Sequence, residues 1–209
     1  MSRPFINDPD HLRLLDGQRY VVLRATGPIR AAYVQVQGLV RETLADLDVS
    51  YPAEPHLTLL GLAAGTGLEA VRGLVSDWAR DVPPLELEIE KVSVFPSPFQ
   101  IVIVQIRKNP TLFGAMSRLR ERAHQQGLVD LADIAPNDWI FHLSVACCSS
   151  LNTASWGDAS RAVNELVVPA AKAVASDAEI VAFDNGQESS VGVVPFTGAA
   201  VNADGQEDV

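Results

Sequence analysis

The sequence predicts an α+β fold of two pseudo-symmetric lobes, each an antiparallel sheet backed by helices, with a central cleft between them. Segments of strict alternation predict strands, and segments with an apolar residue every three or four positions predict helices. The order helix, strand, helix, two strands then occurs twice, over residues 29–107 and 110–196. The first strand of each repeat carries a histidine, so the repeats are expected to bring two histidines together.

We expect residues 18–197 to form one bilobal domain, with a polar N-terminal arm at 1–17 and a flexible tail at 198–209. Hydrophobic residues make up 47% of the 209 positions, which is enough to build a sizeable core. No apolar run approaches the ~18 residues of a membrane span, and the first residues lack an apolar signal core. The sequence therefore predicts a cytoplasmic protein, expected to be a monomer.

In the first repeat, turn residues separate the periodic segments. The apolar run within Gln18–Ala25 predicts a strand that precedes the repeat, and Pro28 suits the first turn of the next helix. Pro83 and Pro84 end a second helix. The expected elements are a helix over 29–48, the histidine strand 55–62, a helix over 68–80, and a hairpin of strands 85–90 and 99–107 around a turn at Phe95-Pro96-Ser97-Pro98.

The second repeat begins with Asn109 and Pro110, which can cap and start a helix, and Gly127 stops that helix. A polar loop leads to the second histidine strand. The expected elements are a helix over 110–126, the strand 139–147, a helix from about 155, and strand-like runs at 171–183 and 189–196.

The two histidine strands share one pattern, His56-Leu57-Thr58-Leu59 and His142-Leu143-Ser144-Val145. Side chains at positions i and i+2 of a strand share a face, so each strand presents one imidazole and one hydroxyl opposite its apolar residues. A single motif of this kind could easily occur by chance. The alternative to a functional site is that the two histidines are structural and hydrogen-bonded within the fold. Two copies with the same pattern of faces favour a functional site.

Two facing imidazoles suit the cleavage of a phosphodiester without a metal, because one can accept the proton of water while the other protonates the leaving oxygen. Histidine serves both tasks because its ordinary pKa lies near 6.5. Thr58 and Ser144 would then donate hydrogen bonds to the phosphate oxygens. A catalytic zinc normally has three protein ligands, and the two strands offer two histidines with no third ligand in register. A serine hydrolase would need a Gly-x-Ser-x-Gly turn around Ser144, which the segment lacks. Both interpretations are therefore weaker.

These paired motifs resemble those of the 2H phosphoesterase superfamily, whose bacterial members include 2'-5' RNA ligases and RNA 2',3'-cyclic phosphodiesterases. The resemblance covers residues 18–196 and includes Phe95-Pro96 before the second hairpin strand. It implies hydrolysis of a 2',3'-cyclic phosphate to a phosphomonoester, with His56, Thr58, His142 and Ser144 as the catalytic residues and no cofactor or metal. A 2'-5' ligase activity and a non-catalytic phosphate-binding module remain as alternatives.

The net charge of −10 bears on the partner, since a protein that grips duplex nucleic acid needs a surplus of Lys and Arg. We therefore expect a small cyclic phosphate, a nucleotide or a short RNA end, and neither a duplex nor a membrane. A base also needs an aromatic surface, for which Tyr20, Phe95, Phe99 and Trp139 are available. Alternation assigns Trp139 to the core, so Tyr20 and Phe95 are the predicted substrate-binding residues.

Overall fold

The computed structural model describes residues 3–4, 13–132, 134–185 and 187–199. Most of the expected arm and tail lies outside these residues. In the described chain one sheet of nine strands, all paired antiparallel, runs in the order β1-β9-β8-β2-β3-β6-β5-β4-β7. The strands are β1 Arg3–Pro4, β2 Arg19–Arg24, β3 His56–Leu62, β4 Leu85–Phe95, β5 Ile101–Ile106, β6 His142–Cys147, β7 Lys172–Ala175, β8 Asp177–Asp184 and β9 Gln187–Pro195.

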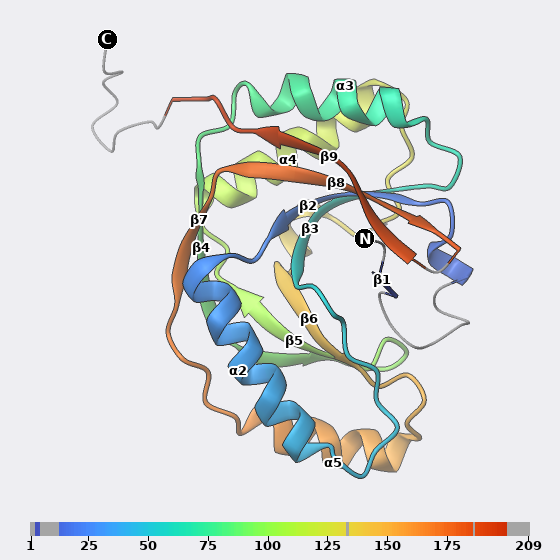
Figure 1. Ribbon diagram of the computed structural model, residues 1–209, viewed down its shortest axis with the longest axis vertical. Coiled ribbons are helices and arrows are strands. Elements are labelled where there is room, and N and C mark those ends of the chain that lie inside the picture. Colours follow the sequence, from blue (N-terminus) through green and yellow to red (C-terminus); the bar gives the residue numbers. More distant parts are fainter. Residues whose placement is uncertain (1–2, 5–12, 133, 186, 200–209) are drawn as a thin grey trace.

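The sheet is strongly curled, and its helices lie on the outer, convex side (Figure 1). Strands β9, β8, β2 and β3 form what we call the first lobe, covered by α3 and α4; strands β6, β5, β4 and β7 form the second lobe, covered by α2 and α5. The helices are α2 Gly27–Thr43, α3 Leu68–Ala79, α4 Pro110–Gln125 and α5 Thr153–Asn164, with a short 3-10 helix η1 at Pro136–Asp138. The predicted bilobal α+β fold class is thus confirmed.

The lobes do not coincide with the two sequence repeats. The first repeat gives β3 and α3 to the first lobe but gives α2 and the β4–β5 hairpin to the second. The second repeat divides in the same way, because β6 and α5 join the second lobe while α4, β8 and β9 join the first. Each lobe is therefore assembled from both halves of the chain.

Three expected strands have clearly different bounds. The strand expected at 85–90 continues to Phe95 as β4. The run at 171–183 is two strands, since β7 pairs with β4 in the second lobe and β8 pairs with β2 in the first. The second histidine strand begins at His142 rather than at residue 139, because η1 ends at Asp138 and the chain joins the sheet only after Ile140. Trp139 therefore lies before the strand rather than in it.

The two lobes meet at the pairing of β3 with β6, where Leu57 and Leu143 are registered partners. Both leucine side chains are fully buried in the main hydrophobic core. Helix α2 fixes the position of β6 from the outer side, since the Tyr33 hydroxyl donates to the Ser144 carbonyl at 2.9 Å and the Gln37 amide donates to the Val145 carbonyl at 3.2 Å. We call this β3–β6 pairing the seam.

Leu143→Ala tests how much the seam contributes to the stability of the fold. We expect the free energy of unfolding to fall by about 2–5 kcal/mol, because the substitution removes buried methyl groups and leaves a cavity that only partly closes. Urea denaturation followed by circular dichroism measures this change. Val167→Ala is the control: Val167 is 84% exposed, so its truncation should change stability by less than ~0.5 kcal/mol.

Candidate active site

The register of the seam determines where the four motif side chains point. Leu57 and Leu143 face the core, so their neighbours at His56, Thr58, His142 and Ser144 lie on the opposite, concave face of the sheet. Continuing the antiparallel register by one residue sets His56 opposite Ser144 and Thr58 opposite His142. The fold thus brings the four residues predicted from the two motifs together on one surface.

His142 is held by its own strand and by an aromatic neighbour. Its Nδ1 donates to the Ile140 carbonyl at 2.8 Å, which leaves Nε2 as the unprotonated nitrogen of the neutral ring. The Phe95 ring meets it edge-on, with centroids 4.8 Å apart. Burial lowers the pKa of His142; the bond to Ile140 opposes this shift, and the charge of His56 adds to it. The two imidazoles therefore interact electrostatically.

His56 has a different environment, made of charged side chains. Its Nδ1 lies 3.6 Å from Oε2 of Glu188 on β9 and 3.5 Å from Nη1 of Arg24 on β2. Arg24 also donates to Glu179 on β8 at 2.5 Å and to Glu188 at 2.5 Å. We call Arg24, Glu179 and Glu188 the acidic clamp of His56.

Both carboxyls of the acidic clamp are ionised more readily than usual. Burial raises the pKa of Glu188, but hydrogen bonding and charge from His56 and Arg24 outweigh it, so this pKa is lowered overall. Burial also raises the pKa of Glu179, and the hydrogen bonds from Arg24 and Ser190 again bring it below its usual value. The clamp therefore places the Glu188 carboxylate and the Arg24 guanidinium beside His56, with Glu179 bound to Arg24.

A pocket of about 410 Å³ opens next to His142. Its walls are mostly apolar and come from the β4–β5 turn and from the segment before β6. They include Phe95, Pro96, Phe99, Ile101, Trp139 and Ile140, with the Asp138 carboxylate among the few polar groups. Trp139 is half-buried here: its ring lies under the Arg120 guanidinium at 5.2 Å, and it also packs against the main hydrophobic core, as alternation predicted.

Tyr20 lies on the concave face as well, but in a small apolar cluster. Its ring meets Phe183 edge-on at 5.4 Å between centroids, and its hydroxyl donates to the Gln18 side chain at 2.5 Å. Burial raises the pKa of Tyr20 to about 12. Of the two aromatic residues predicted to bind substrate, only Phe95 contacts a histidine of the paired motifs.

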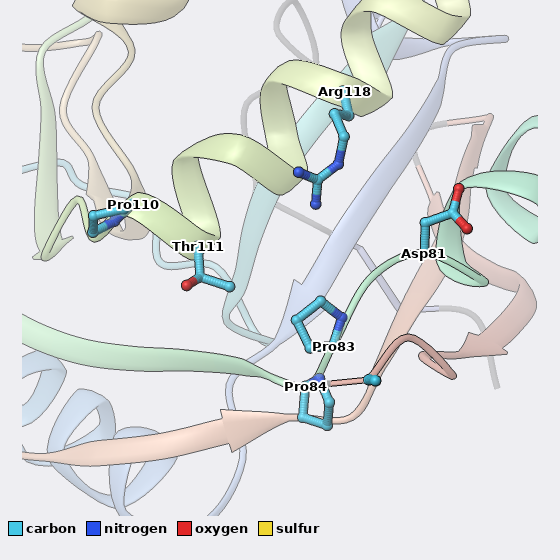
Figure 2. A pocket seen from close by; sticks show the side chains of 7 residues that line it. Asp81, Pro83, Pro84, Pro110, Thr111 and Arg118 are labelled. Carbon is cyan, nitrogen blue, oxygen red and sulfur yellow. The ribbon is translucent and has the colours of Figure 1, made fainter. Parts of the chain in front are cut away.

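A second hollow, of about 600 Å³, lies over the outer helices and includes no residue of the histidine strands. Figure 2 shows Arg118 of α4 pointing into it, with Asp81, Pro83 and Pro84 on one side and Pro110 and Thr111 on the other. Its lining holds no histidine or cysteine, and we assign no chemistry to it.

Among the residues that the structure covers, no three His, Cys, Asp or Glu side chains are grouped to hold a metal ion. Within the same residues no helix is long and apolar enough to cross a bilayer. Cys147 and Cys148 are buried and unbridged, and burial raises the pKa of the Cys148 thiol to about 12.

A model of the 2'-5' RNA ligase superfamily matches residues 29–187, well over half of the chain. The protein belongs to this superfamily. The match begins in helix α2 and includes both histidine motifs, so the resemblance to the 2H phosphoesterases that the motifs suggested is confirmed. Among curated proteins, none matches the sequence significantly.

Solved structures agree in fold. The protein TT0787 of Thermus thermophilus has 17% sequence identity and a TM-score of 0.62, covering 88% of this chain and 100% of its own. LigT of E. coli complexed with 3'-AMP has 14% identity and a TM-score of 0.61, covering 87% and 98%. Usb1 of Kluyveromyces marxianus has 10% identity and a TM-score of 0.55, covering 86% and 98%.

The lowered pKa of His142 gives a prediction about stability and pH. A histidine whose pKa is lower in the folded state binds its proton more readily when unfolded, so folding loses stability as pH falls below the ordinary value of 6.5. His142→Asn should therefore flatten the loss of stability between about pH 7 and about pH 5. Urea midpoints across this range measure the slope; equal slopes in the two proteins would contradict the prediction.

Proposed function

We propose that this protein hydrolyses a 2',3'-cyclic phosphate, carried by an RNA end or a nucleotide, to a phosphomonoester. The observation that supports this most strongly is the concave face beside the seam, where two imidazoles and two hydroxyls point the same way. Membership of the superfamily supports an enzyme that acts on phosphate esters. Structures of E. coli LigT with 3'-AMP and with ATP make a nucleotide a reasonable ligand for this chain.

The proposed reaction needs two proton transfers and no metal. One histidine takes a proton from water as the water oxygen attacks phosphorus. The bond from phosphorus to one ribose oxygen breaks, and the other histidine gives that oxygen a proton. Thr58 and Ser144 donate hydrogen bonds to the two non-bridging oxygens, where negative charge builds up in the transition state. The two histidines then exchange one proton with solvent to regain their starting forms.

The pocket beside His142 is proposed to hold the nucleobase. Its aromatic and aliphatic walls suit the flat faces of a base, and stacking of this kind typically contributes about 1–3 kcal/mol per base. Because Phe95 contacts both the pocket and the His142 ring, a base stacked there would stand next to the imidazole that acts on its own phosphate. Tyr20 remains the alternative stacking surface, on the side of His56.

His56→Ala and His142→Ala each test the catalytic assignment. We expect either substitution to lower kcat for opening a 2',3'-cyclic nucleotide by about 10²–10⁴-fold, because one of the two proton transfers is lost. EDTA should leave the wild-type rate unchanged. His124→Ala is the matched control, since His124 is exposed near the end of α4, outside the two motifs, and its loss should not alter kcat.

Near wild-type rates in both motif variants would refute the proposed function. Binding of a nucleotide without any product from the wild-type protein would instead favour the non-catalytic module. The same assay with an RNA that carries a cyclic end, followed by analysis of the linkages formed, separates hydrolysis from 2'-5' ligation.

Phe95→Leu and Tyr20→Leu form a matched pair that locates the base. If the base stacks beside His142, Phe95→Leu should raise KM by about 10-fold with a smaller effect on kcat, as expected for the loss of one stacking contact. Tyr20→Leu should leave KM within about two-fold, provided the variant remains folded by circular dichroism. The reverse result would place the base on the His56 side of the concave face.

A further inference from the structure

The two histidines occupy equivalent positions in the sheet but have different partners. The register relates them by an approximate two-fold axis through the Leu57–Leu143 pair. The Nδ1–H group of His142 donates a hydrogen bond to a neutral backbone carbonyl, that of Ile140. His56 instead turns Nδ1 toward a carboxylate and a guanidinium. This difference breaks the symmetry between the two imidazoles.

Glu188 is well placed to control the His56 ring. Its side chain and that of His56 are each 9% exposed, so little water screens their interaction. Arg24 donates to Oε1 of Glu188 at 2.5 Å, which leaves Oε2, at 3.6 Å from Nδ1, as the oxygen turned toward the ring. Glu179 in turn binds Arg24 through both of its oxygens, at 2.5 and 3.1 Å. The orientation of Glu188 is therefore fixed by its neighbours.

The charges of the acidic clamp do not balance by themselves. Arg24 of β2 and Glu188 of β9 lie beside His56, Glu179 of β8 binds Arg24, and His142 of β6 interacts with His56 by charge. Within the clamp one guanidinium stands against two carboxylates, so these three groups together carry one negative charge. Glu188 is the member of the clamp whose carboxylate lies beside His56.

We propose that Glu188, held in place by Arg24 and Glu179, is a positioning residue. Its carboxylate accepts a hydrogen bond from the Nδ1–H group of His56 and so makes this histidine the proton donor of the pair. The assignment of donor and acceptor rests on the proposed function; the positioning contact does not. His56 then donates the proton on Nε2 to the leaving oxygen. The neutral ring that remains is protonated on Nδ1, and this N–H group stays hydrogen-bonded to the Glu188 carboxylate. His142, with its bare Nε2, takes the proton of the attacking water.

The opposite arrangement makes a distinct prediction about the ring. Arg24 can only donate, so if its contact at 3.5 Å prevailed, Nδ1 of neutral His56 would be bare and Nε2 would carry the proton. When a protonated His56 loses its Nε2 proton, the ring that remains is protonated on Nδ1. A ring protonated on Nε2 therefore cannot be the product of this donation. The position of the proton on neutral His56 therefore decides between Glu188 and Arg24 as its controlling partner.

The first experiment needs no substrate, and its deciding measurement is made on the wild-type protein. Nitrogen-15 spectra of histidine-labelled protein, with signals assigned by loss in His56→Ala and His142→Ala, report which ring nitrogen carries the proton. We expect neutral His56 to hold its proton on Nδ1 in the wild-type protein, and a substantial Nε2-protonated fraction in Glu188→Gln. A wild-type His56 protonated on Nε2 would overturn the proposal.

The second experiment is the pH dependence of kcat/KM, whose basic limb reports the proton donor and whose acidic limb reports the acceptor. Glu188→Gln keeps the shape of the side chain but removes its charge. We expect it to lower the maximum of kcat/KM by about 100-fold and to move the basic limb to lower pH, with the acidic limb unchanged. Glu188→Asp, which keeps the charge, should restore part of the loss.

Glu69→Gln is the matched control, because Glu69 also pairs with an arginine, Arg72 at 2.7 Å, but on the outer helix α3. It should change neither limb. A purely structural role for Glu188 would lower the maximum and leave both limbs in place, which would refute the assignment of His56 as donor. If the wild-type protein opens no cyclic phosphate while Glu188 still controls the His56 proton, the proposed function fails and the positioning role stands.

Discussion

One constraint governs the rest of the molecule: strands β3 and β6, far apart in sequence, must lie side by side with Leu57 and Leu143 in register. A strand alternates its side chains between two faces, so this single pairing decides that two histidines and two hydroxyls share the concave surface. A slip of one residue in β6 would turn its histidine and its serine into the core. Tyr33 and Gln37 of α2 oppose such a slip because they bind consecutive carbonyl groups of β6 from behind.

The motif residues were predictable from sequence because their information is local. The alternation in 56–60 and 142–146 identifies the strands, and the repeat relates them. The acidic clamp had no such signal: Glu188 and Glu179 belong to strands near the end of the chain, and Arg24 closes an apolar strand near its beginning. Their meeting depends on which strands become neighbours in the sheet, a property that spacing within one segment does not encode.

The aromatic pocket illustrates the same limit. Phe95 was identified from its turn, but its companion Trp139 was assigned to the core alone, so its place in the wall of the pocket was missed. Proline and the polar residues of η1 keep that segment out of the sheet. A residue that packs against the core can thus also line a pocket, and alternation alone does not distinguish the two.

The exchange of elements between the lobes has a consequence for how the chain can be divided. The point between β5 and α4 looks like a natural boundary, since one repeat ends and the next begins there. Either fragment, however, would carry only part of each lobe, with strands lacking their neighbours and helices lacking the sheet they cover. The two repeats are thus interlocked, and neither is an independent folding module that could be lost, duplicated or transplanted alone.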